Sequence, residues 1–156
     1  TRMRQEYDNA PIPGERWDDS LRRTTRSIRE VDLAHANAYI LLRGWMPEVQ
    51  FHTRRIFHLH KDQGMPLAVY RPMWSMVEAF LTGFISQEIA QRNAVFAPID
   101  ENDPDKDWLA VAETAYTDES FSAGIELIIG GVRELAAPDP CEWRTPLDRS
   151  TWTWGT

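Results

Sequence analysis

Apolar side chains recur at steps of three and four residues in the stretch that begins at Trp17. This spacing places them on one side of an α-helix that packs one face against a core. The positions in this stripe are Trp17, Leu21, Thr24, Ile28, Val31, His35, Ala38 and Leu42. Residues 18–20 (DDS) can cap the start, and Gly44 stands where helices commonly end. The pattern predicts a helix of about 24 residues from Trp17 onwards.

Two later stretches show the same periodicity. One covers 72–93, with Pro72 near its first turn and a stripe of Trp74, Val77, Leu81, Phe84 or Ile85, and Glu88. The other begins at Thr117, which two acids follow, and its stripe consists of Phe121, Ile125, Ile128, Val132 and Leu135. A short helix is expected in 107–116, after an acidic connection with two prolines at 94–106. Three more helices are therefore predicted.

Glycines interrupt the last of these helices at positions 124, 130 and 131. Each costs an α-helix up to about 1 kcal/mol relative to alanine. Because a glycine lets a neighbouring backbone approach closely, tight packing is the expected reason for all three.

The segment 47–63 fits two secondary structures. Pro47 at a first helical position and Gly64 as a stop favour a helix. The alternation of apolar and polar residues at 49–60 favours a strand, and a β-hairpin at 49–71 is the corresponding alternative. We prefer the helix, because a strand of twelve residues would be about twice the usual length.

These elements predict a mainly α fold, an irregular bundle of four or five helices with extended arms at both ends. Residues 1–16 contain two prolines and no apolar periodicity, which predicts an extended N-terminal arm. Residues 17–136 form the predicted helical domain. Residues 137–156 form a C-terminal tail rich in proline and tryptophan.

Charge restricts the classes of partner. The formal net charge is −7, which argues against nucleic-acid binding. Residues 1–61 carry eleven Lys and Arg against eight acids, and residues 62–156 carry six against sixteen. Copies of such a chain can pair basic front to acidic back, so self-association or a protein partner is expected. No apolar run is long enough for a membrane helix and no export signal is visible, so we expect a cytoplasmic protein without a membrane partner.

Two groups of side chains are candidates for an interface. The arginines 22, 23, 26 and 29 follow one side of the first helix, where ion pairs with acidic segments of the same or a neighbouring chain are expected. The tail carries Trp143, Trp152 and Trp154, and tryptophan is enriched at the centres of interfaces. The predicted interface residues are Trp143, Trp152, Trp154, Arg22, Arg26 and Arg29.

Histidines and carboxylates provide the candidates for chemistry. His35 and Glu88 break two apolar stripes, so they are expected either to hydrogen-bond to each other or to bind a metal. A helical 47–63 would place Glu48 and His52 on one face as two further ligands. His58 and His60 would share a face only on a strand, and the simplest expectation for the histidines of this segment is a solvated face.

Known catalytic and nucleotide-binding motifs are absent from the sequence. The leading hypothesis is therefore a structural or interaction subunit of a homo- or hetero-oligomeric assembly. The alternative is a metal-dependent helical-bundle enzyme, redox or hydrolytic, that binds a first-row transition metal through His35, Glu48, His52 and Glu88.

Overall fold

The protein is mainly helical, as the sequence predicts. The computed structural model describes residues 12, 15–37, 57–58, 60–61, 65–96 and 98–136. Its helices in these ranges are α1 (Trp17–Ala34), α4 (Leu67–Asn93), α5 (Lys106–Thr114) and α6 (Asp118–Leu135). No strand occurs among these described residues.

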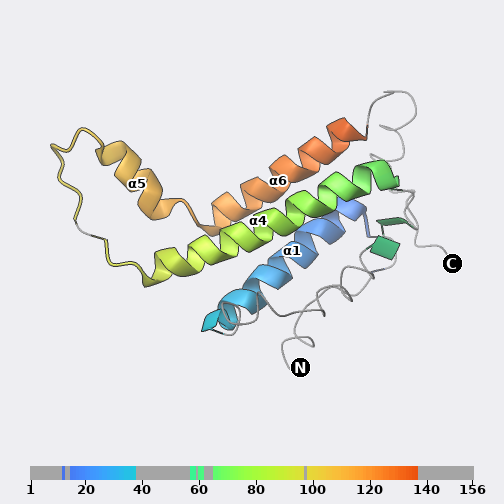
Figure 1. Ribbon diagram of the computed structural model, residues 1–156, viewed down its shortest axis with the longest axis horizontal. Helices are drawn as coiled ribbons and strands as arrows, with labels where there is room; N and C mark the ends of the chain where they lie inside the picture. The colour runs from blue at the N-terminus through green and yellow to red at the C-terminus, as the bar shows by residue number, and fades with distance from the viewer. Residues whose placement is uncertain are drawn as a thin grey trace.

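Helices α1, α4 and α6 pack side by side, and α5 lies on the connection between α4 and α6 (Figure 1). Contacts between charged residues show the direction of α1 against α6. Arg22 bonds to Glu126 and Arg133 bonds to Asp18, so these two helices run antiparallel. Helix α4 runs parallel to α1 and antiparallel to α6.

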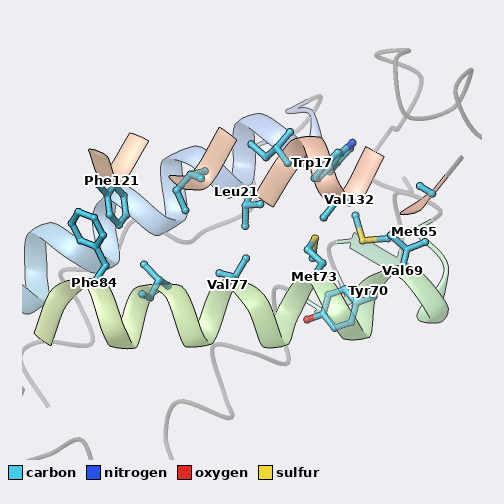
Figure 2. Packing of buried hydrophobic residues seen from close by; sticks show 14 of the residues in the cluster. Trp17, Leu21, Met65, Val69, Tyr70, Met73, Val77, Phe84, Phe121 and Val132 are labelled. Atoms are coloured by element: carbon cyan, nitrogen blue, oxygen red, sulfur yellow. The ribbon is translucent and has the colours of Figure 1, made fainter. Parts of the chain in front are cut away.

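The core lies where the apolar stripes of these three helices meet. Figure 2 shows Trp17 and Leu21 of α1 and Val132 of α6 above Met73 and Val77 of α4. The other buried apolar residues in the described part of the chain are Val31, Met65, Val69, Tyr70, Leu81, Phe84, Ile85, Ile89, Phe121, Ile125, Ile129 and Ala136. The core therefore forms from stripes with the three-and-four spacing that the sequence shows.

Helix α1 starts at the predicted residue but ends earlier than expected. It closes at Ala34, because His35 leaves the helical conformation with φ −119° and ψ 36°. The backbone N–H of His35 is shared between the carbonyls of Val31 and Asp32, a bond pattern common at helix ends. Arg16 occupies the N-cap position without a side-chain cap, so the expected cap at 18–20 is wrong.

Helix α4 begins five residues before the predicted start. Pro66 is its N-cap, and Pro72 lies inside the helix. Proline lacks the N–H that would bond to the carbonyl four residues earlier, which predicted a boundary at this point. Burial of Val69, Tyr70 and Met73 in the core favours the longer helix.

The middle of the chain does not form the alternative hairpin. The described residues 57, 58, 60 and 61 are helical, in agreement with the preferred interpretation. A hairpin at 49–71 is wrong, because residues 67–71 belong to the first turns of α4. The other residues of the segment, 47–56, 59, 62 and 63, lie outside the described residues.

Helix α6 begins at the predicted position. The Thr117 side chain accepts a hydrogen bond from the backbone N–H of Ser120 at 3.2 Å, and two acids follow it. The buried stripe differs from the prediction at its C-terminal half. Ile129 is fully buried where Ile128 was expected, and Leu135 is exposed.

The three glycines of α6 have different surroundings. A Cβ at Gly124 would collide with the ring of Phe80, so tight packing explains this glycine as predicted. A Cβ at Gly130 or Gly131 would meet no atom of the described residues within 4 Å, so close packing within this part of the chain is the wrong reason for these two.

The predicted arms and domain boundaries fall mostly outside the described residues. This applies to the tail 137–156 and to most of 1–16. Within the described ranges, no helix combines the length and the apolar character that crossing a bilayer requires.

Candidate functional site

A buried ion pair joins α1 to α4. The Nε of Arg29 donates to Oε2 of Glu88 at 2.7 Å, and its Nη2 donates to Oε1 at 2.7 Å. Both side chains are nearly inaccessible to solvent. This two-bond geometry is the strongest that an arginine and a carboxylate can form.

Further groups extend the pair towards α6 and the end of α4. The Nη2 of Arg29 also donates to Asp118 at 2.6 Å, and Arg92 donates to Glu88 at 2.7 Å. The Arg29 guanidinium lies 4.9 Å from the centre of the Phe121 ring, within cation–π distance. Arg29 therefore connects α1 to the last turns of α4 and to the first turn of α6.

These contacts change the pKa values of the groups involved. Burial acts to lower the pKa of Arg29, but its hydrogen bonds to Glu88 and Asp118 raise it overall. The hydrogen bond from Arg29 lowers the pKa of Asp118. Arg29 and Asp118 therefore both keep their charges at neutral pH.

A cleft of about 570 Å³ opens beside this network, between the end of α1 and the start of α6. Its charged lining consists of Arg26, Arg29, Glu30, Arg92 and Asp118, and its apolar lining includes Leu33, Ala34 and Phe121. The volume falls within the range of about 300–1,000 Å³ that is usual for specific binding sites. Its acids and arginines nearly balance, so neither charge dominates.

Helix α5 has an apolar face that covers nothing among the described residues. None of its residues is buried. Trp108 is 67% exposed, Val111 is 58% exposed, and Leu109 is also exposed. Sequence reasoning placed this helix correctly but did not identify its apolar face as a site. The signal was present, because apolar residues at 108, 109, 111 and 112 form one arc of the helix between acids.

The predicted interface arginines have different roles. Arg22 pairs with Glu126 across to α6, and Arg29 is buried in the pair with Glu88. Arg23 pairs with Glu15. Arg26 is exposed and makes no ion pair or hydrogen bond with the described residues. Of the four arginines, this one is available to a partner.

Trp143, Trp152 and Trp154 lie outside the described residues, so their interface role stays a prediction.

The predicted metal ligands are only partly described. Glu48 and His52 lie outside the described residues. His35 is half-buried at the C-cap of α1, and Glu88 is buried as expected. Both oxygens of Glu88 already accept hydrogen bonds from arginine, so a metal would have to displace them. Within the described ranges, no three His, Cys, Asp or Glu residues cluster at metal-binding distance.

His60 does not belong to a solvated face. It is fully buried, whereas His58 is exposed as expected. Among the described residues, neither ring nitrogen of His60 has a hydrogen-bond partner, and the nearby Tyr70 hydroxyl has none either. The two rings meet edge to face at 5.9 Å. Burial lowers the pKa of His60 to about 4, so the ring is neutral near pH 7.

A second charged cluster lies at the other end of the bundle, around the buried Asp18. Arg16 and Arg133 donate to its carboxylate at 3.1 and 2.7 Å, and Arg22 lies 3.3 Å away. Burial acts to raise the pKa of Asp18, but these three arginines lower it overall. This cluster joins α1 to α6 and has the character of a structural contact.

Comparison with protein-family models, with curated proteins and with solved structures finds no match to this chain.

Proposed function

We propose that the chain is a structural or interaction subunit of a homo- or hetero-oligomeric assembly, and that its 94–117 connection is a docking element. The observation that carries the proposal is the exposed apolar face of α5 on this connection.

The length of the connection supports this role. Twenty-four residues separate Asn93 from Asp118, although α4 and α6 pack directly against each other. Connections of about two to eight residues join most antiparallel helices, and longer ones are commonly functional. The packing of α4 against α6 does not require so long a connection between them.

The stability of α5 gives a second argument. A nine-residue helix is marginal in water without tertiary contacts. Its Trp108 and Val111 side chains would gain free energy if a partner removed them from water. Val95, which is 99% exposed, and the exposed Phe96 on the same connection would gain in the same way. A partner would therefore stabilise α5 as it binds.

The metal-dependent alternative draws no support from the described residues, because arginines occupy the carboxylate of Glu88.

The proposal predicts the native mass of the chain in an extract of its source cells. The wild type should elute in a complex larger than its own 18.1 kDa. A Trp108→Ser/Leu109→Ser/Val111→Ser variant should shift to a smaller mass, because it loses the apolar contact. Elution of the wild type as a free 18.1 kDa chain would contradict the proposal.

A further inference from the structure

We propose that α5 of one copy docks in the cleft between α1, α4 and α6 of a second copy. This inference rests on the proposed docking role of 94–117 and names the partner. In the contact, Trp108, Leu109 and Val111 lie against the apolar lining of the cleft. The acids beside them face the exposed arginines at its rim.

The chemistry of α5 defines what its partner must offer. Asp107 and Glu113 border the apolar arc on its two sides, as the 3.6-residue helix period places them. The whole 94–117 connection carries six acids and a single lysine. A suitable partner surface is therefore apolar at its centre and has cations at its rim.

The cleft has this arrangement on the same chain. Leu33, Ala34 and Phe121 contribute its apolar surface. Arg26 has no ion-pair partner among the described residues, and the Arg92 side chain is 58% exposed beyond its bond to Glu88.

The two arginines differ in how free they are, because Arg92 is bonded to Glu88 whereas Arg26 makes no ion pair with the described residues. Asp118 is bonded to Arg29 but its side chain is 88% exposed, and Glu88 is buried behind Arg29 and Arg92. Glu30 is exposed and offsets part of the positive charge. The charge attraction is therefore local to the arginines at the rim, and the apolar contact adds to it.

The connection after α5 holds this helix away from the cleft of its own chain. The backbone N–H of Tyr116 donates to Oε1 of Gln91 at 3.2 Å, and the Tyr116 ring packs edge to face on Phe84 at 5.2 Å. These contacts fix the chain between α5 and α6, and α5 projects beyond the bundle (Figure 1). A second copy can reach this helix without breaking them.

The positions of α5 and the cleft favour a closed dimer. Both lie at the end of the bundle where α1 and α4 finish and α6 begins. A two-fold axis near this end lets each copy place its α5 in the cleft of the other. In such a dimer the apolar face of α5 is covered in both copies. Neither α5 is then left free to bind a third copy.

The test uses the full chain and two classes of variant. Trp108→Ser/Val111→Ser removes the apolar contact of α5. Arg26→Glu/Ala34→Glu changes two exposed residues of the cleft. Matched controls make the same changes elsewhere: Met76→Ser/Leu127→Ser replaces two exposed apolar residues, and Ala68→Glu/Arg71→Glu replaces an exposed alanine and arginine at the far end of α4.

Sedimentation equilibrium of the purified proteins measures the dimer dissociation constant, and circular dichroism verifies the fold. The α5 variant should raise this constant about thirtyfold or more, as expected for loss of a central aromatic contact. The cleft variant should raise it at least about tenfold. Both controls should match the wild type. An equimolar mixture of the two variants should dimerise more tightly than either alone, because one α5–cleft contact is intact in the mixed pair.

Three results would overturn the inference. One is a wild type that stays monomeric at high concentration. The others are a folded cleft variant that dimerises like the wild type, and a mixture that associates no better than its components. A large native complex in cell extract together with a monomeric purified chain would leave the docking role intact and show that the partner is a different protein.

Discussion

Arg29 binds Glu88 through two hydrogen bonds of 2.7 Å across the interface of α1 and α4, with both side chains nearly excluded from solvent. This pair replaces apolar contacts at one end of the core. The centres of the Phe84 and Phe121 rings lie 5.9 and 4.9 Å from the guanidinium carbon. An unpaired charge in these apolar surroundings would therefore destabilise the fold strongly.

The first prediction concerns this pair. Glu88→Ala should destabilise the fold by about 3–5 kcal/mol, because it leaves the buried Arg29 with Asp118 alone. The double change Arg29→Met/Glu88→Met should cost less, since it removes both charges. Urea unfolding measures both values.

The matched control for this prediction is Glu126→Ala. It removes the exposed partner of Arg22 and should cost about 0.2–1 kcal/mol. Equal costs for the variants at positions 88 and 126 would show that the burial of the first pair has no energetic consequence.

The second prediction concerns pH and His60. Its pKa is lowered from 6.5 to about 4 in the fold, because burial of the ring disfavours its charged form. Between these values the unfolded chain binds more protons than the native one, so stability falls as the pH falls from 6.5 to 4. The loss should reach about 3 kcal/mol and end near pH 4.

A His60→Phe variant separates this effect from other titrations. It should lose the dependence between pH 6.5 and 4, as measured by urea unfolding at a series of pH values. Asp18, whose pKa is lowered below 3.8, makes the stability of both proteins depend on pH only at still lower pH. Parallel pH curves for the two proteins between 6.5 and 4 would contradict the assignment.

The third prediction compares two glycines of one helix. Gly130→Ala should raise the free energy of unfolding by up to about 1 kcal/mol, because no described residue lies within 4 Å of the added methyl group and alanine favours the helix. Gly124→Ala should lower it by about 1–3 kcal/mol, because the methyl group displaces the ring of Phe80. Thermal melts of the two variants should shift in opposite directions, and a shift of both in the same direction would contradict the packing argument.

The fourth prediction concerns the tail. If Trp152 and Trp154 anchor an interface, truncation after Pro140 should reduce the mass of the assembly by light scattering. Assembly should also weaken as salt rises from about 50 to 500 mM if charged rims contribute. An unchanged mass for a folded truncated chain would remove the tail from the interface and leave α5 as the docking element.

The sequence predicted the helices well because helical periodicity is a local property. The start of α6 follows from Thr117 and the acids after it, and the stripe through Val77 and Leu81 places α4 in the core. The ends of the helices were harder to predict from the sequence. The same local pattern continues past Ala34, where α1 ends, and Pro72 suggested a boundary that burial of Val69 and Tyr70 overrides.

The candidate site was only partly predictable. The sequence identified Glu88 as a buried polar residue that needs a partner, but suggested His35, whereas the structure places Arg29 and Arg92 on its carboxylate. Partners 59 residues apart cannot be paired from spacing alone. Likewise, the apolar arc of α5 is visible in the sequence, but its exposure is not.

The sequence by itself determined that the segments of α1, α4, α5 and α6 are helical, roughly which side of α1 and α4 is apolar, and that Glu88 would need a partner. Only the tertiary structure decided that Arg29 is that partner, that His60 is buried while His58 is exposed, and that α5 projects from the bundle. The physical reason is the range of the interactions. Helix formation depends on neighbours within four residues, whereas burial and charge pairing depend on which helices the packed chain brings together.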